Sequence, residues 1–364
     1  MALGTRAVES LEVSPAFWRG KRVFLTGHTG FKGSWLSLWL QRLGAQVTGY
    51  ALRPPTRPSL FEEARVARGM KSVIADVREP RKLAAALARS RAQIVLHMAA
   101  QSLVRESYAD PVGTYATNVM GTVGVLEAAR AVRSVRAIVV VTSDKCYDNR
   151  EHPGAYAETD AMGGADPYSS SKGCAELVTA AYRRSFLAAT GVQVASARAG
   201  NVLGGGDWSR DRLVPDALRA FHAGERLGVR NPGAIRPWQH VLDPLHGYLL
   251  LAERLWRQRA YAEAWNFGPA AADHKPVRWL VDQLARRWGL HAAWRADRAP
   301  KPHEAQLLRL DCTKAIKRLR WRPRLDLHRT LDWVVEWHRR CDQGEDAREV
   351  TLEQIQRFER AAAG

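Results

Sequence analysis

The chain has 364 residues, 46% of them hydrophobic, and it carries 55 Lys and Arg against 37 Asp and Glu, a formal net charge of +18. This apolar content excludes a mainly disordered chain, and no apolar run reaches the roughly 18 residues of a membrane span. The four cysteines lie far apart without a C-x-x-C pair, so we expect a reduced protein with neither a disulfide framework nor a metal site.

The first residues lack the apolar segment of a signal peptide, so we expect no export and a cytoplasmic protein. The arginines are spread through the whole chain, and no helix-turn-helix, zinc-finger or aromatic RNA-binding signature is present. We interpret the charge as a basic solvated surface with a preference for anionic small molecules. No nucleic acid and no membrane partner is expected.

The first two thirds of the chain alternate short apolar runs with helical patterns. In chain order, we expect strand Lys21–Thr26, helix Gly33–Leu43, strands Gln46–Leu52 and Ser72–Val77, helix Leu83–Arg91, strand Gln93–His97, helix Thr114–Val132, strand Ala137–Ser143, helix Ser169–Phe186 and strand Val192–Arg198. Strands without polar alternation, separated by helices, predict a parallel sheet covered on both faces. Right-handed crossovers then make it a doubly wound, Rossmann-type α/β fold.

The pattern loosens after about Val202, where Gly204–Trp208 interrupts it and segments rich in Arg, Pro and Trp follow. We therefore predict three parts. Residues 17–202 form the Rossmann domain with the catalytic residues, residues 203–340 form a smaller, mainly substrate-binding α/β part, and residues 341–364 form a peripheral tail.

Gly27, Gly30 and Gly33 directly follow the first strand and open a helix. Glycines let the backbone turn tightly and approach a pyrophosphate, whose charge meets free N–H groups at the helix N-terminus. This context favours a dinucleotide site over a simple tight turn. The second strand ends without the acidic residue that usually holds the adenosine ribose, and Arg53 nearby would suit a 2′-phosphate or simply face solvent. These residues alone leave NAD and NADP open.

Tyr168 and Lys172 have the i, i+4 spacing that sets both side chains on one helix face. An ammonium beside a phenol lowers the pKa of the phenol, which makes Tyr168 a candidate base near neutral pH. The spacing alone recurs by chance. Its specificity comes from Thr142–Lys145, which closes an upstream strand and places the Ser143 hydroxyl at the carboxyl edge of the sheet.

With the glycine loop, Ser143 and the Tyr168/Lys172 pair in this order, the sequence resembles the extended short-chain dehydrogenase/reductases. Within that superfamily it looks like the CDP-D-glucose branch of the nucleotide-sugar 4,6-dehydratases. The resemblance runs from about Phe17 to about Trp337. The strings that carry it are Gly27–Trp35, Thr142–Asn149, Gly163–Glu176 and Arg236–Val241.

The resemblance implies a lyase with a retained NAD that converts CDP-D-glucose to CDP-4-dehydro-6-deoxy-D-glucose, a step toward deoxysugars of surface polysaccharide. It implies that Tyr168 takes the C4 hydroxyl proton as hydride leaves C4, while Ser143 holds the C4 oxygen. Lys145 would then take the C5 proton, and Asp144 would protonate the departing C6 hydroxyl before hydride returns to C6. A free lysine has a pKa of about 10.4, so burial and nearby positive charge must favour neutral Lys145. The division of roles between Asp144 and Lys145 stays open.

The candidate cofactor-binding residues combine the glycine loop, later strand ends and the catalytic helix. They are Gly27, Thr29, Gly30, Phe31, Lys32, Gly33, Asp76, Val77, Ala99, Tyr168 and Lys172. The Asp76 carboxylate would lie near the adenine amino group, or would serve as a turn or capping residue.

The substrate side needs cations for two phosphates. Arg236 is the strongest candidate because Arg binds phosphate bidentately, and the resemblance places Asn201, Arg212 and Arg230 along the same wall, with His303 as a weaker candidate. For Arg212 and Arg230 a simple surface charge explains the sequence as well. Trp208 and Trp238 are more typical of a core than of a base platform, and Asn118 more typical of a helix tether.

Rival hypotheses are a UDP-sugar 4-epimerase, a dehydratase of another nucleotide sugar, a non-catalytic NAD-binding sensor and a nucleic-acid-binding protein. An epimerase needs no acid/base pair after Ser143, so Asp144 and Lys145 discriminate against it. The choice of CDP rests on the resemblance alone. The resemblance also implies a homo-oligomer paired through the helices at 114–132 and 169–186.

Overall fold

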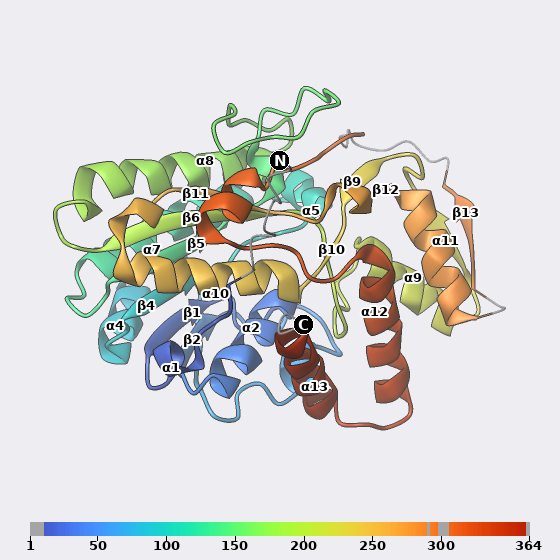
Figure 1. Ribbon diagram of the computed structural model, residues 1–364, viewed down its shortest axis with the longest axis horizontal. Helices are drawn as coiled ribbons and strands as arrows, with labels where there is room; N and C mark the ends of the chain where they lie inside the picture. The colour runs from blue at the N-terminus through green and yellow to red at the C-terminus, as the bar shows by residue number, and fades with distance from the viewer. Residues whose placement is uncertain (1–10, 290–291, 298–305, 362–364) are drawn as a thin grey trace, which may run out of the picture.

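The computed structural model describes residues 11–289, 292–297 and 306–361. Within these ranges the central sheet has seven strands, all parallel, in the order β3-β2-β1-β4-β5-β6-β11 (Figure 1). Its strands are β1 (Arg22–Thr26), β2 (Gln46–Ala51), β3 (Lys71–Ile74), β4 (Ile94–His97), β5 (Ala137–Val141), β6 (Gln193–Ala199) and β11 (Ala264–Phe267). The first six are in the strand order of a Rossmann fold, which confirms the predicted fold class.

Successive side chains of the strands point to opposite faces, and each face has its own core. Val23 and Leu25 pack with the helix that follows β1, whereas Phe24 packs on the other face, against the helices after β3 and β4. Residues of β4 and β5 divide in the same way. The continuous apolar strands of the sequence are therefore buried on both faces, as predicted.

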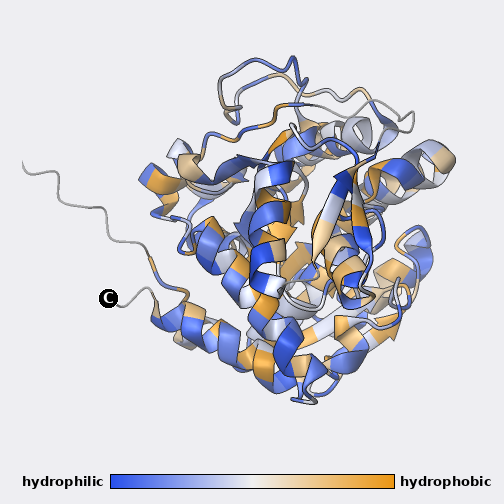
Figure 2. Cartoon of the chain, turned by 90° about the vertical axis from the view of Figure 1, so that its right-hand side faces the viewer, coloured by the Kyte–Doolittle hydropathy of each residue, from blue (hydrophilic) through white to orange (hydrophobic). Residues whose placement is uncertain are grey.

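The helices cover these faces and form the second part of the molecule. They are α1 (Pro15–Trp18), α2 (Phe31–Arg42), α3 (Leu60–Glu63), α4 (Pro80–Ser90), α5 (Val104–Ala109), α6 (Pro111–Tyr115), α7 (Gly121–Arg130), α8 (Pro167–Tyr182), α9 (Leu213–His222), α10 (Leu242–Arg257), α11 (Val277–Trp288), α12 (Leu327–Asp342) and α13 (Ala347–Arg360). Hydrophobic and hydrophilic residues are mixed along the helices, as the orange and blue of Figure 2 show. Helix α2 is buried all round from Gly33 to Leu40, whereas α9, α11 and α12 bury mainly one side.

Two predicted helices are longer composite elements. The helix predicted over 114–132 comprises α6, a π-helical turn at Ala116–Met120 and α7, and the one predicted over 169–186 comprises α8 and a π-helical turn at Arg183–Leu187. Helix α8 begins at the Asp166 cap, whose carboxylate accepts a hydrogen bond from the backbone N–H of Ser169 at 2.9 Å. Pro167 at its first position suits a helix start.

A third core lies beside the carboxyl edge of the sheet and unites α9, α11 and α12 (Figure 1). Short strand pairs frame it, namely β7 (Val202–Leu203) with β10 (Gln239–His240), β8 (Arg226–Val229) with β13 (Ala293–Ala296) and β9 (Ile235–Pro237) with β12 (His274–Pro276). The predicted division at residues 202, 340 and 341 stays a prediction.

Parts of the chain beyond residue 202 return to the central sheet. Helix α10 packs on β5 and β6, and β11 adds a strand beside β6 that the sequence analysis missed. Helix α13 packs on α2, and its residues Val350, Ile355 and Phe358 are fully buried in the same core. No helix of the described ranges has the length and apolarity to span a membrane.

Candidate active site

A cavity of about 730 Å³ opens at the carboxyl edge of the sheet, between the glycine loop after β1 and the third core. It lies where β1 and β4 are neighbours, at the point where the strand order of the parallel sheet reverses, which is where open α/β sheets bind ligands. Every predicted site residue within the described ranges lines it. These are Gly27, Thr29, Gly30, Phe31, Lys32, Gly33, Asp76, Val77, Ala99, Ser143, Asp144, Lys145, Tyr168, Lys172, Asn201, Arg212, Arg230 and Arg236. His303 lies outside the described residues.

The glycine loop turns at Gly27, whose φ of +79° favours glycine. A Cβ on Gly33 would lie 2.0 Å from the carbonyl oxygen of Gly27, so the first turn of α2 packs directly on the loop. Gly30 caps α2 with its backbone and has no side chain to cover the N–H groups. The loop thus leaves the α2 N-terminus open toward the cavity, as an anion site requires.

The adenosine end differs in detail from the sequence expectation. Asp76 follows β3, and its carboxylate accepts hydrogen bonds from the Arg78 side chain, the shortest at 2.6 Å. These bonds lower the pKa of Asp76 and hold it as an anion. Arg53 follows β2 and lines the same cavity. Both residues therefore line the cavity beyond the carboxyl ends of β2 and β3.

The catalytic turn follows β5 directly: it begins at Ser143 and continues as a single 3₁₀ turn over Asp144–Cys146. The Ser143 hydroxyl donates to Oδ1 of Asp144 at 3.0 Å and accepts from the backbone N–H of Lys145 at 3.2 Å. Oδ2 of Asp144 is buried and has no hydrogen-bond partner among the described residues. The turn therefore holds a hydroxyl, a carboxyl and an ammonium side by side at the edge of the sheet.

Burial is the largest influence on Asp144, and it raises the pKa of this carboxyl against the opposing charges of Lys145, Arg236 and Lys32. A raised pKa favours the protonated acid. This is the form that can donate a proton to a leaving hydroxyl, so the structure supplies the environment that the acid role needs.

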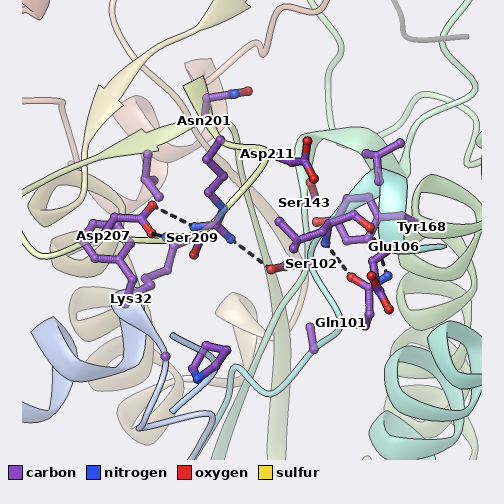
Figure 3. A pocket seen from close by; sticks show the side chains of 18 of the residues that line it. Lys32, Gln101, Ser102, Glu106, Ser143, Tyr168, Asn201, Asp207, Ser209 and Asp211 are labelled. Carbon is purple, nitrogen blue, oxygen red and sulfur yellow. Dashed lines mark hydrogen bonds and ion pairs between the residues drawn. The ribbon is translucent and has the colours of Figure 1, made fainter. Parts of the chain in front are cut away.

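Tyr168 lies in the first turn of α8, and it lies beside Ser143 in Figure 3. Its backbone N–H donates to Oγ of Ser107 at 3.1 Å, and the next turn of α8 is tied to Asn118, which donates to Oγ of Ser171 at 2.8 Å. Asn118 also bonds both backbone groups of Gln101. The expectation that Asn118 tethers a helix is confirmed.

The prediction that the pKa of the Tyr168 phenol is lowered is wrong when only the groups of the protein act on it. Burial raises the pKa of Tyr168 to about 12 and outweighs the hydrogen bond with Ser143 and the charge of Arg212. Burial also lowers the pKa of Lys172 to about 8, against the nearby Cys146 and Glu176. The physical reason is that desolvation disfavours both charged forms, which spacing along a helix does not reveal.

The predicted phosphate ligands form one wall of the cavity. Arg236 is 5% exposed and donates to the carbonyl of Ile235 at 3.0 Å. Arg212 bridges the cavity, donating to Asp207 at 3.1 Å and to Ser102 at 2.9 Å, as the dashed lines in Figure 3 show. Arg230 pairs with Asp211 at 3.5 Å. Arg236 is thus buried in the wall, whereas the Arg212 and Arg230 side chains are held by ion pairs and stay about one third exposed (31% and 30%).

The two tryptophans behave as expected. Trp238 is buried in the third core and donates to the carbonyl of Lys275 at 2.9 Å, although it also reaches the cavity wall. Trp208 packs edge-on against Trp337 with ring centroids 5.7 Å apart.

Sequence analysis missed the side-chain environment of Lys32, which was chosen only as part of the glycine loop. Its half-buried ammonium lies 3.4 Å from the Tyr248 hydroxyl on α10, a residue more than 200 positions away. Burial lowers the pKa of Lys32 to about 7, helped by the charges of Arg212 and Lys172. A lysine in a string of glycines was the only signal available from the sequence.

The doubly wound sheet, the glycine loop, the strand-end serine and the Tyr168/Lys172 pair around one cavity define an extended short-chain dehydrogenase/reductase. A family model described as GDP-mannose 4,6 dehydratase matches residues 24–333. The chain therefore belongs to this 4,6-dehydratase family, and it is a hydro-lyase.

Individual relatives agree with this assignment. The CDP-glucose 4,6-dehydratase of Salmonella typhimurium is 54% identical over 336 residues, 91% of this chain and 94% of the relative. The dTDP-glucose 4,6-dehydratase of Streptomyces antibioticus is 30% identical over 69% of this chain and 71% of its own length. Among solved structures, MoeE5 in complex with UDP-glucuronic acid and NAD is 26% identical with a TM-score of 0.73 and covers 88% of this chain and 100% of its own.

Proposed function

We propose that this protein is a CDP-D-glucose 4,6-dehydratase that uses NAD and releases CDP-4-dehydro-6-deoxy-D-glucose and water. The observation that carries the proposal is the meeting of the Ser143–Lys145 turn with Tyr168 and Lys172 in one cavity that also contains the glycine loop. The Salmonella relative, 54% identical over nearly the whole chain, supports CDP-D-glucose as the substrate.

The residues of the glycine loop fit a dinucleotide. A side chain at Gly33 would meet backbone at 2.0 Å, and one at Gly27 would meet the Ala99 nitrogen at 2.8 Å, so neither position has room for a side chain. The open N-terminus of α2 suits the pyrophosphate. The chemistry that a bound NAD supplies is a hydride acceptor for C4 of the glucose and a hydride donor for C6. MoeE5, which was solved in complex with UDP-glucuronic acid and NAD, supports this cofactor.

Tyr168 and Ser143 handle the C4 hydroxyl. Tyr168 takes its proton, and Ser143 hydrogen-bonds the C4 oxygen. Because burial raises the pKa of Tyr168 to about 12, the phenolate needs added positive charge. The cationic nicotinamide of a bound NAD would add that charge beside Lys172, which lies one helical turn along α8.

Asp144 and Lys145 carry the elimination. The C4 ketone acidifies the neighbouring C5 proton, which Lys145 takes, and Asp144 gives its own proton to the C6 hydroxyl so that it leaves as water. The raised pKa of Asp144 favours this acid role. Lys145 is the residue next along the turn, and its half-buried amine lines the same cavity.

The arginine wall holds the diphosphate. Arg236 is the main anchor because a buried guanidinium offers a fixed fork of donors to phosphate oxygens. Arg212 and Arg230 are positioned by Asp207 and Asp211 to add charge along the wall, and Asn201 lines the same cavity. His303 remains a candidate for the same ligand.

The test is incubation of the purified protein with CDP-, dTDP-, GDP- and UDP-glucose, followed by detection of the 4-keto product. With CDP-glucose deuterated at C4, the label is expected at C6 of the product. Loss of the label to water, or turnover of a different nucleotide only, would refute the assignment. Replacing Asp144 and Lys145 should abolish dehydration, whereas a 4-epimerase would tolerate the change.

We further propose a homo-oligomer that works in the cytoplasm. Large hydrophobic side chains are exposed on the α6–α7 and α8 elements, namely Val112 (78%), Met120 (60%), Leu177 (60%) and Phe186 (42%). Such a patch on neighbouring helices suits a second copy of the chain. Light scattering of the wild type and of Leu177→Asp checks it: a monomer in both would refute pairing. The four free cysteines suit a reducing compartment.

A further inference from the structure

Glu176 is a buried acid one helical turn beyond Lys172 in α8. It is 5% exposed, and its carboxylate faces the sheet instead of solvent. Oε2 accepts hydrogen bonds from Oγ of Ser196 at 2.6 Å and from the Arg198 guanidinium at 2.8 Å, and Oε1 accepts one from the hydroxyl of Thr142. The carboxylate is thereby joined to both β5 and β6.

Arg198, 4% exposed, continues the network to the far side. Its second nitrogen donates to the Tyr147 hydroxyl at 2.8 Å, and the guanidinium lies 5.0 Å from the centre of the Tyr147 ring. The Tyr147 hydroxyl donates onward to Oδ1 of Asn266 in β11 at 2.7 Å. The ion pair is thus hydrogen-bonded on both sides, while Nε of Arg198 is buried without a hydrogen-bond partner among the described residues.

The two hydroxyls of this network belong to the residues that flank the catalytic turn. Thr142 is the residue directly before Ser143, and Tyr147 is the residue directly after Cys146, where the 3₁₀ turn ends. One buried ion pair therefore holds both ends of the catalytic turn. Because its acid belongs to α8, the same pair also ties the turn to the helix that carries Tyr168.

We propose that the Glu176–Arg198 pair clamps the catalytic turn, with Thr142 and Tyr147 as positioning residues that hold Ser143, Asp144 and Lys145 against Tyr168. This inference rests on the proposed function, because the turn matters only if its side chains perform the reaction. A buried ion pair gains little stability over an apolar pair of similar volume, whereas its hydrogen bonds define direction and distance. We therefore infer that the Glu176–Arg198 pair fixes the geometry of the catalytic turn.

The test removes one hydroxyl at a time and leaves the charges in place, since loss of Glu176 or Arg198 would strand a buried charge and risk unfolding. The variants are Thr142→Val and Tyr147→Phe, both close in shape to the native residues. Ser196→Ala is the matched control. It loses a bond to the same carboxylate, but from the middle of β6 and not from an end of the turn.

The first readout is hydrogen–deuterium exchange of the peptide that covers residues 143–147, which needs no activity. We expect faster exchange in Thr142→Val and Tyr147→Phe and wild-type exchange in Ser196→Ala. The second readout is steady-state turnover of CDP-glucose. We expect kcat to fall about tenfold in the two positioning variants with KM nearly unchanged, because a shift well under 1 Å misaligns the acid and base, and to stay within about twofold in the control.

Exchange and turnover that match the control in both positioning variants would overturn the clamp. If all three variants show the same faster exchange and the same fall in kcat, the cause is a general loss of stability. That result would also overturn the clamp. If the wild type turns over no nucleotide glucose, the proposed function fails, but the exchange of the turn still decides whether the pair holds it.

Discussion

A substitution at the start of α2 tests the cofactor assignment, because the three atoms nearest to a side chain at Gly33 would all be backbone atoms of Gly27 and His28. The Cβ of Gly33→Ala would lie 2.0 Å from the Gly27 carbonyl oxygen, 2.8 Å from the Gly27 carbonyl carbon and 2.9 Å from Cα of His28. No side chain can rotate away to relieve these contacts. The loop must therefore move by about 1 Å from α2, a displacement that overpacking data put at about 1–3 kcal/mol of stability.

The same displacement should weaken NAD binding. Losing one charge-assisted hydrogen bond from the loop to the pyrophosphate costs about 1.5–3 kcal/mol, which is a loss of affinity of about 10- to 100-fold. Urea unfolding measures the first effect, and quenching of tryptophan fluorescence by added NAD measures the second. Gly30→Ala is the control for stability, because its Cβ would meet its nearest atom at 3.5 Å and its φ of −76° suits alanine. Wild-type stability and affinity in Gly33→Ala would refute the reasoning.

Three more predictions follow from buried groups. Asp144→Asn should lower the rate of dehydration by at least about 100-fold. CDP-glucose should still reduce bound NAD in a single turnover, since the acid acts only after C4 oxidation. A wild-type rate of dehydration would contradict the assigned role. Burial raises the pKa of Asp243 to about 7, so its ionised form destabilises the native state increasingly from about pH 4 to pH 7. Asp243→Asn should therefore gain up to about 4 kcal/mol in urea unfolding near pH 8 and little near pH 4, and an equal gain at both would contradict it. Phe358→Ala removes a fully buried ring that meets Trp39 edge-on, with ring centroids 5.7 Å apart, and should lower the free energy of unfolding in urea by about 3–5 kcal/mol. Arg360→Ala, at an exposed position of the same helix, is the control and should leave the stability unchanged. An unchanged urea midpoint in Phe358→Ala would show that α13 is peripheral.

Local sequence pattern was a good guide to the first six strands of the sheet. The strands of residues 21–198 were predicted to within about three residues at either end. The agreement is closest for β1, β4, β5 and β6, which are apolar runs buried on both faces, whereas the edge strand β3 has no buried residue and is shorter than predicted. Strand β11 was missed. Its residues AWNF follow a charged segment, and only pairing with β6 makes them a strand.

The candidate site divides in the same way. Gly27, Ser143 and Tyr168 are each marked by a motif whose chemistry is local, such as a tight turn, a strand end or an i, i+4 pair. No local sequence motif identifies the hydrogen-bond partners of Glu176. An acid in the Tyr168 helix looks like part of a solvated face until β6 brings Arg198 beside it.

Sequence by itself determined the alternation of strands and helices up to residue 198 and the tight turn of the glycine loop, and it supplied the candidate catalytic side chains, because these depend on neighbours a few positions apart. Tertiary structure alone decided which charges are buried and what they touch. It raised the pKa of Tyr168 where helix spacing predicted a fall, placed Lys32 against Tyr248, and gathered distant arginines into one wall. The physical reason is that desolvation and ion pairing depend on what surrounds a group in space, and those surroundings include residues tens of positions away, as for Glu176 and Arg198, or more than 200, as for Lys32 and Tyr248.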